Sequence, residues 1–256
     1  MAGDSILYSA KEHVAYITLN RPDAGNRINF AMIQMLMEIC SQINGNKDIY
    51  LVVVRGAGEV FCSGRELERS EAPGQSQDIS TGISAAEAIA AVRQPSVAAI
   101  NGDALGEGLE IALACDLRIA SDTSRFGLPQ ITEARIPVQG GTQRLPRVVG
   151  RGKALEMVLT GEIIDARTAL EIGLVNKLIE PATLNSEVDA ITRNIADKAP
   201  WALQYVKEAV NKGLDLTLDQ GLRLEADLYF LLHTTADRTE GITSFLQKKP
   251  PSYKGE

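Results

Sequence analysis

Three short strand patterns, separated by helical patterns, constrain the fold of this chain more than any other feature. They cover residues 50–54, 96–100 and 117–120, and the first is apolar throughout. A short strand that is apolar on both faces is typical of a parallel sheet covered by helices. Apolar residues recur at helical spacing in segments 32–43 and 83–92, which precede the first and the second of these strand patterns. The alternation of strand and helix predicts an α/β layered core.

The second half of the chain has a different character. From Thr142 onward helical patterns dominate, and the strand signal is limited to residues 174–179. We predict two regions, a core over 1–198 and a helical C-terminal region over 199–256, because Ala199-Pro200 precedes the last two predicted helices. Residues 250–256 are predicted to form a loose tail. The expected helices are 142–149, 151–159, 165–172, 184–198, 201–212 and 216–233.

Composition excludes several classes of protein. The net charge is −7, with 45% hydrophobic and 23% charged residues, which is typical of a globular chain and unlike a disordered one. An acidic chain lacks the basic surface that general nucleic-acid binding needs, and no apolar run approaches the ~20 residues of a membrane span. The three cysteines have no metal-site spacing. With no secretory pattern in the first residues, we expect a cytoplasmic protein that binds neither nucleic acid nor membrane.

A glycine-rich turn between a predicted strand and a predicted helix is the strongest local motif. It is Asn-Gly-Asp-Ala-Leu-Gly-Glu-Gly-Leu-Glu, residues 101–110. The first turn of a helix directs backbone N–H groups toward any oxygen that becomes negative during a reaction. A purely structural turn is the alternative that the pattern leaves open. The motif is not a dinucleotide fingerprint, since Ile111 stands where that fingerprint needs glycine. Residues 61–66, Phe-Cys-Ser-Gly-Arg-Glu, form a second strand end with the same two interpretations.

Several segments of the chain, in order, resemble the enoyl-CoA hydratase/isomerase family, which is also called the crotonase family. The resemblance covers nearly the whole chain and is specific because so many motifs occur in sequence. The matching segments are 17–22, 61–67, 95–116, 126–129, 136–137, 140–145, 159–161, 221–225 and 237–241.

The resemblance implies a fold and a class of substrate. The expected fold is a crotonase-like spiral of ββα units followed by a helical trimerisation region, assembled as a homotrimer or a dimer of trimers. The expected substrate is an acyl-CoA thioester. The matching oxyanion-hole residues are Arg65 and Glu107, through their backbone N–H groups. The resemblance implies no metal and no redox cofactor, since coenzyme A is part of the substrate.

The coenzyme A moiety is expected to lie along one segment of the chain. In the family it is held by the residues that match Arg65, Glu66, Leu67 and Glu68. Arg27, shortly after the first turn, is a further candidate for contact with the CoA phosphates.

The catalytic residues show an informative departure from the family. Family hydratases use two Glu residues, and the first matches Glu110. At the second position this chain has Gln130, whose amide forms hydrogen bonds but does not exchange a proton as a carboxylic acid does. We therefore expect Glu110 to be the single acid/base and Gln130 to position water or substrate.

Glu107 and Arg65 also stand where the family has small residues. Glu107 lies three positions before Glu110, so the two carboxylates are expected either to raise one another's pKa or to point apart. A surface ion pair is the expected role of the Arg65 side chain.

The resemblance, with Glu110 retained, implies an enzyme, a hydratase/dehydratase (hydro-lyase) of enoyl-CoA or dienoyl-CoA thioesters. A conjugated cyclic dienoyl-CoA is one specific alternative. Isomerisation, decarboxylation and thioester hydrolysis are other reactions that the family implies, although family isomerases keep a carboxylate at the position of Gln130. A non-catalytic or RNA-binding member is the third alternative. The charge of −7 weighs against RNA, and the retained Glu110 weighs against an inactive scaffold.

Overall fold

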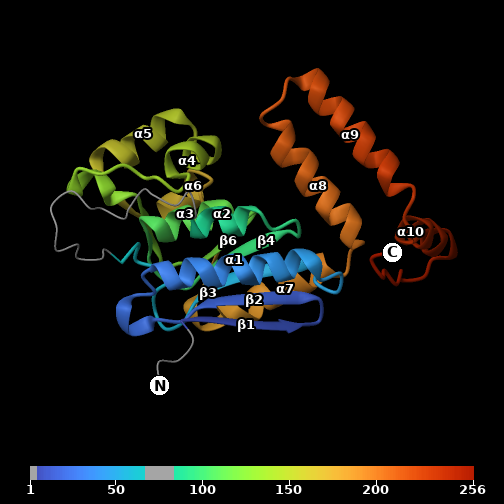
Figure 1. The fold of residues 1–256 in the computed structure, drawn as a ribbon, viewed down its shortest axis with the longest axis horizontal. Coiled ribbons are helices and arrows are strands. Elements are labelled where there is room, and N and C mark those ends of the chain that lie inside the picture. The colour runs from blue at the N-terminus through green and yellow to red at the C-terminus, as the bar shows by residue number, and fades with distance from the viewer. Residues whose placement is uncertain (1–4, 67–83) are drawn as a thin grey trace.

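The fold of the protein is built around one large sheet (Figure 1). A computed structural model describes residues 5–66 and 84–256. In this part of the chain six strands pair in the order β1-β2-β3-β4-β6-β9. β1 is antiparallel to β2, and the other neighbouring pairs are parallel. The strands are β1 (Ile6–Lys11), β2 (Val14–Leu19), β3 (Leu51–Gly56), β4 (Ser96–Ile100), β6 (Leu117–Ser121) and β9 (Lys177–Ile179).

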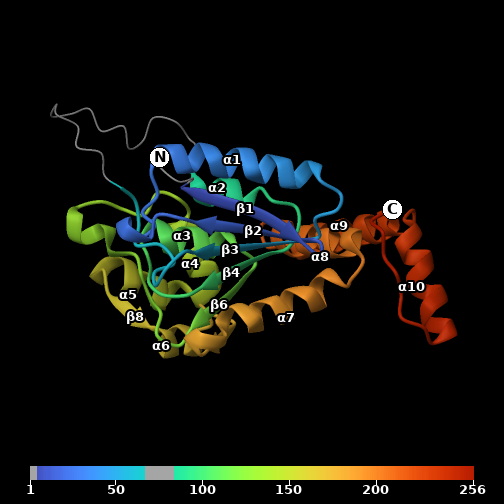
Figure 2. The ribbon, with the colours of Figure 1, turned by 90° about the horizontal axis from the view of Figure 1, so that it is seen from below.

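Helices cover both faces of this sheet, as the apolar strand patterns predict (Figure 2). Successive side chains of β3 point to opposite faces. Val52 and Val54 therefore join the core beneath α1, α2 and α3, whereas Leu51 and Val53 pack with Leu184 and its neighbours on α7. These helices are α1 (Phe30–Gly45), α2 (Ala85–Ala90), α3 (Glu107–Ala114) and α7 (Leu184–Ala196).

A second, smaller sheet lies beside α3. Its strand order is β5-β7-β8, with β5 parallel and β8 antiparallel to β7. The strands are β5 (Ala104–Leu105), β7 (Arg125–Gly127) and β8 (Ile163–Asp165). The adjoining helices are the 3₁₀ helix η3 (Pro129–Glu133), α4 (Gly141–Val149), α5 (Arg151–Thr160) and α6 (Ala166–Glu171). This sheet places the start of η3 next to the start of α3, because β5 leads into α3 and β7 leads toward η3.

Three helices form the C-terminal part of the chain. They are α8 (Pro200–Gly213), α9 (Leu218–Leu232) and α10 (Ala236–Gln247). Figure 1 shows α8 and α9 packed as a hairpin that extends away from the large sheet. Lys207 of α8 is anchored to the core, since its Nζ lies 2.8 Å from Asp116 Oδ2 and donates to Gln94 O at 2.9 Å. The division at 198/199 stays a prediction.

The predicted loose tail is wrong. The carboxylate of Asp237 accepts hydrogen bonds from the N–H groups of Lys254 (2.7 Å) and Gly255 (2.9 Å). The indole of Trp201 donates to Gly255 O at 3.0 Å. These contacts hold the tail between α8 and α10, and the distance in sequence between the partners explains why composition did not reveal them.

Other differences concern short or irregular elements. α10 and β1 were not predicted, and only Lys177–Ile179 of the predicted strand 174–179 is a strand. The polar residues 66–80, which include Pro and Gly, are expected from the sequence to form a mobile loop. All of this segment but Glu66 lies outside the described residues. Within residues 5–66 and 84–256, no helix has the length and apolar character that a membrane crossing requires.

Candidate active site

The two glycine turns singled out in the sequence lie side by side in the structure. Cys62 and Ala104 form an isolated parallel bridge, in which Leu105 N donates to Cys62 O at 3.0 Å. Gly64 lies two residues after Cys62, and Gly106 lies two residues after Ala104. Both glycines have a positive φ (117° and 53°). A Cβ on Gly106 would lie 3.7 Å from the Cα of Gly64. The two predicted oxyanion residues come directly after these glycines, so the structure brings their backbone segments together.

The start of α3 approaches the first turn very closely. A Cβ on Gly108 would lie 2.1 Å from Cys62 O and 2.8 Å from Cys62 Cβ, inside the van der Waals contact distance. Glycine at position 108 is therefore required for α3 to begin where it does. The close approach fixes the N-terminal end of the helix against the strand end that contains Gly64.

Gly108→Ala is expected to lower the free energy of unfolding by about 1–3 kcal/mol, because the added methyl group overpacks the contact with Cys62. Thermal or denaturant unfolding measures this change. Gly152→Ala in α5 is the matched control, since a Cβ there meets nothing within 4 Å and should leave stability unchanged or slightly raised. An unchanged stability of Gly108→Ala would contradict the close approach.

Glu110 is a buried carboxyl group in the first turns of α3. The residue is only 2% exposed. Oε1 accepts hydrogen bonds from Gln139 N at 2.7 Å and from Gly141 N at 2.9 Å. Burial raises the pKa of Glu110, and the two hydrogen bonds and the charge of Arg144 oppose that rise. The carboxyl is thus held by one oxygen, which leaves Oε2 for other contacts.

Gln130 contacts that second oxygen. Its Nε2 lies 3.5 Å from Glu110 Oε2, a long hydrogen bond. It would also lie 3.7 Å from a Cβ on Gly106, so the amide stands between the acid and the glycine turn. The Oε1 atom of Gln130 is buried and has no hydrogen-bond partner among the residues that the structure describes. The predicted pair Glu110–Gln130 is therefore brought together at the N-terminal end of α3.

Glu107 is buried (4% exposed) at the first position of α3. Its charge contributes to the raised pKa of the Cys62 thiol, which reaches about 12 mainly through burial. Burial is the cause that raises the pKa of Glu110. The structure therefore gives no support to the interpretation that Glu107 raises the pKa of Glu110.

The segment predicted to hold coenzyme A is described only in part. Ile28 bridges to Arg65, with Ile28 N donating to Gly64 O and Glu66 N donating to Ile28 O. This ladder brings the exposed Arg27 next to Arg65 and Glu66. Leu67 and Glu68 lie outside the described residues.

One contact made with this segment was missed by the sequence analysis. Arg21 Nη1 contacts Glu66 Oε2 at 2.5 Å, which lowers the pKa of Glu66, and it also donates to Arg27 O at 3.0 Å. Its position in the turn that follows β2 gave no signal of these contacts with Glu66 and Arg27.

The two backbone hydrogen bonds that hold Glu110 Oε1, here called the Glu110 clamp, were missed as well. The donors are backbone N–H groups of Gln139 and Gly141, which carry no side-chain signature. The nearest signal is the pair Gly140-Gly141, because a Cβ on Gly141 would lie 3.1 Å from Glu110 Oε1. Arg144 Nη1 donates to Gln139 O at 2.8 Å and helps to hold this loop in place.

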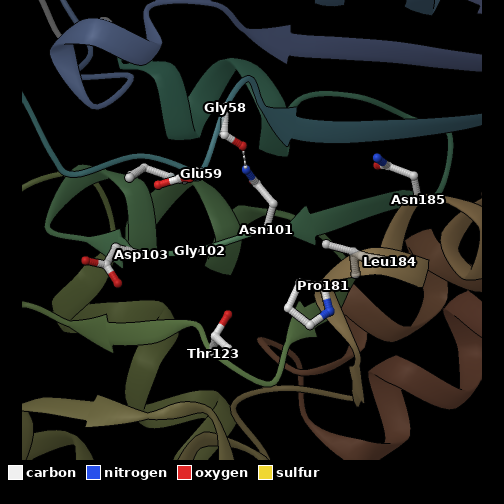
Figure 3. A pocket seen from close by; sticks show the side chains of 10 residues that line it. Gly58, Glu59, Asn101, Gly102, Asp103, Thr123, Pro181, Leu184 and Asn185 are labelled. Atoms are coloured by element: carbon white, nitrogen blue, oxygen red, sulfur yellow. Dashed lines mark hydrogen bonds between the residues drawn. The ribbon is translucent and has the colours of Figure 1, made fainter.

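A polar cavity of about 560 Å³ lies apart from these residues (Figure 3). Asn101 Nδ2 donates to Gly58 O at 2.7 Å across it. The candidate catalytic residues do not line it. The lining residues are Gly58, Glu59, Val60, Asn101, Gly102, Asp103, Thr123, Pro181, Leu184 and Asn185. Among the described residues, no group of three or more His, Cys, Asp or Glu side chains is placed to hold a metal ion.

Known proteins resemble this chain over its full length. The sequence model of the enoyl-CoA hydratase/isomerase family matches residues 9–256. A putative enoyl-CoA hydratase/isomerase of Bacillus subtilis is 43% identical over 99% of both chains. The (E)-benzylidenesuccinyl-CoA hydratase of Thauera aromatica is 38% identical over 98% of this chain and 99% of its own.

The structure agrees with these sequence relationships. A solved enoyl-CoA hydratase from Bacillus anthracis superposes with a TM-score of 0.92, at 38% identity, over 99% of this chain and all of that chain. The predicted crotonase-like fold is confirmed. The chain belongs to the enoyl-CoA hydratase/isomerase family of enzymes.

Proposed function

We propose that this protein is a hydro-lyase that adds water to, or removes it from, an enoyl-CoA or dienoyl-CoA thioester, with Glu110 as its only acid/base. The observation that carries the proposal is the set of contacts made by the Glu110 carboxyl. Its carboxyl is buried, one oxygen is held by two backbone N–H groups, and the other faces an amide. Relatives named as hydratases support hydration rather than another reaction of the family.

The proposed reaction moves one water molecule and its proton. Oε2 of ionised Glu110 takes a proton from water while the oxygen forms a bond to the β-carbon. The electron pair of the double bond moves toward the thioester oxygen, and the N–H groups of Arg65 and Glu107 stabilise the resulting enolate. Glu110 then returns the proton to the α-carbon. One carboxyl performs both proton transfers because Gln130 is an amide.

Gln130 has a positioning role in this scheme. Its side chain stands next to Glu110 Oε2, and its Oε1 has no partner among the described residues. The second O–H of the reacting water donates to that oxygen. Because position 130 carries an amide and not a second carboxyl, the site favours substrates whose hydration depends less on a second acid. A conjugated or cyclic dienoyl-CoA is such a substrate, since its double-bond system accepts water at its far end.

The pH dependence of hydration is expected to report on Glu110. Hydration begins with the ionised carboxyl, so kcat/KM should fall as pH drops through the pKa of Glu110. Because burial raises that pKa, the acid limb should lie above the ordinary glutamate value of 4.5. A profile of kcat/KM against pH measures this. An acid limb at or below the ordinary value, or its persistence in Glu110→Gln, would contradict the role of Glu110.

The proposed partners follow from the same scheme. Coenzyme A is proposed to lie along Arg65, Glu66, Leu67 and Glu68, with Arg27 near its phosphates. No metal or redox cofactor is proposed, because the reaction transfers only water and a proton.

We also propose a homotrimer or a dimer of trimers in the cytoplasm. Large apolar side chains of the C-terminal helices support the assembly, since Phe230 is 69% exposed and Phe245 82% exposed. Size-exclusion chromatography with light scattering tests it, and a monomer would contradict it.

A panel of acyl-CoA thioesters tests the proposed reaction directly. Each is incubated with the protein in isotope-labelled water, and the products are analysed by mass spectrometry. The proposal predicts incorporation of one labelled oxygen into a hydroxyacyl-CoA. Release of free acid, loss of carbon dioxide or a shifted double bond without added oxygen would replace it by thioester hydrolysis, decarboxylation or isomerisation.

A further inference from the structure

Arg144 is a cation beside the Glu110 clamp that has no part in the scheme above. It lies near the start of α4, and its side chain is only partly exposed. Its Nη1 donates to Gln139 O at 2.8 Å, and the N–H of the same Gln139 donates to Glu110 Oε1 at 2.7 Å. Arg144 is therefore connected to the carboxyl group through a single intervening residue.

The loop before α4 is built around the Arg144 side chain. Gly140 has a φ of 101°, and a Cβ there would lie 2.9 Å from Arg144 Cζ, inside the van der Waals contact distance. The backbone N–H of Arg144 also donates to Gly140 O at 2.7 Å. Arg144 thus binds the carbonyl groups of the two residues that precede Gly141, whose N–H is the second donor of the Glu110 clamp.

The Glu110 clamp also sets the direction of Oε2. A carboxyl group is planar, so two donors on Oε1 restrict its rotation and leave Oε2 facing Gln130 Nε2 at 3.5 Å. This is the side on which the proposed reaction places its water. A displaced Gln139 would release Oε1 and let the carboxyl turn away. Misplacing a reacting group by about 1 Å can cost about 10²-fold in rate.

Arginine brings a permanent charge to this position. A neutral side-chain donor is enough to hold a carbonyl oxygen, whereas a guanidinium group is always positive. In the part of the chain that the structure describes, Arg144 forms no ion pair, so no carboxylate neutralises its charge. Burial is the largest effect on the pKa of Glu110 and raises it, and the charge of Arg144 is among the effects that lower it.

The other charged residues around α3 are placed differently. α2, α4 and β5 pack against α3, and η3 and residues 134–140 adjoin it at Glu110. Those other than Glu107 and Arg144 are exposed or paired with each other, and the charge of Glu107 acts on the Cys62 thiol. Removal of Arg144 is therefore the change expected to alter the ionisation of Glu110. The charged residues of these described segments and of α3 are Glu87, Glu107, Glu133, Arg135, Arg144 and Arg147.

We propose that Arg144 is a positioning residue, which holds Gln139 and thereby keeps the Glu110 carboxyl turned so that Oε2 faces the reacting water. Its charge also favours the ionised carboxylate with which hydration begins. The inference rests on the proposed function, because it assigns a further residue to that same site. Arg144 exchanges no proton and acts through Gln139.

Two variants separate the hold of Arg144 from its charge. Arg144→Gln loses both, so kcat should fall by about tenfold or more with KM little changed, and the acid limb of kcat/KM should move to higher pH than in the wild-type protein. Arg144→Lys keeps the charge but not the planar guanidinium, so kcat should fall while the acid limb stays in place. Arg147→Gln removes the same charge from an exposed position of α4 and should change neither.

A purely structural role predicts a different result. It would lower kcat of Arg144→Gln without moving the acid limb to higher pH, and that outcome would overturn the proposal. An unchanged kcat in Arg144→Gln would overturn it as well. If circular dichroism shows that Arg144→Gln does not fold, Arg144→Lys decides the matter, since an unchanged kcat or a displaced acid limb in that variant contradicts the proposal.

Direct titration of the carboxyl keeps the test independent of hydration. Protein labelled with ¹³C at the glutamate side-chain carboxyl is titrated by NMR without substrate, and the signal of Glu110 is the one that Glu110→Gln lacks. Its midpoint should lie at higher pH in Arg144→Gln than in the wild-type protein and should not move in Arg147→Gln. If the midpoint moves but no enoyl-CoA is hydrated, the proposed function fails while the effect of Arg144 on Glu110 is retained. An unmoved midpoint in Arg144→Gln would overturn the inference even in an active hydratase.

Discussion

Glu110→Gln is expected to lower kcat for hydration by at least ~10²-fold, because the variant has no group that exchanges a proton with water or with the α-carbon. The substitution preserves the shape of the side chain. The amide oxygen of glutamine can still accept the hydrogen bonds that Gln139 N and Gly141 N donate to Glu110 Oε1 at 2.7 and 2.9 Å. The loss should therefore appear in turnover, while binding of the acyl-CoA is largely kept. Steady-state kinetics and calorimetric binding measure the two effects separately.

A charge-matched control accompanies this variant. Glu87→Gln changes an exposed glutamate in the first turn of α2 and should leave kcat near the wild-type value. Near-normal turnover by Glu110→Gln would remove Glu110 from the mechanism. A collapse of its unfolding temperature would instead show that the clamp on Oε1 needs a carboxylate.

Gln130→Glu is expected to raise the rate of crotonyl-CoA hydration by at least about tenfold, since it places a second carboxyl next to Glu110 Oε2. Two carboxyl groups at this separation favour a state in which they share one proton, with one acting as base and the other as acid. The pH profile of the variant should consequently become bell-shaped. The initial rate of hydration, followed through loss of the conjugated enoyl absorbance, measures the change.

Gln143→Glu provides the comparison for this substitution. It adds the same charge at an exposed position of α4 and should leave the rate unchanged. If Gln130→Glu hydrates crotonyl-CoA no faster than the wild-type protein, the amide does not limit that reaction, and the interpretation of position 130 is wrong.

The parts of the fold that could be predicted are those with a local signal. The apolar run 50–54 indicated a strand covered on both faces, and β3 lies between α1 and α7. β5 has only two residues and depends on β7 for its pairing, so no pattern in its own sequence predicted it. The tail was misjudged for a similar reason, since Asp237 holds it by contacts with distant backbone N–H groups.

In the candidate site, too, features with a local signal could be predicted and those that depend on distant residues could not. The residue pattern indicated the turns at Gly64 and Gly106, resemblance to the family identified the carboxyl of Glu110, and the structure brings all three together. The direction of the Glu107 side chain was left open, because sequence spacing alone does not set side-chain orientation. The clamp by Gln139 and Gly141 could not be predicted, since its donors are backbone groups whose positions depend on the loop before α4.

The central claim is that a thioester carbonyl lies between the N–H groups of Arg65 and Glu107 while Glu110 performs both proton transfers. A crystal structure with a bound 3-hydroxyacyl-CoA tests it most directly. The account predicts that the thioester oxygen lies within about 3.1 Å of both backbone nitrogens, with the 3-hydroxyl in hydrogen-bond contact with Glu110 Oε2. A carbonyl bound away from either nitrogen, or a 3-hydroxyl that faces another ionisable side chain, would contradict it.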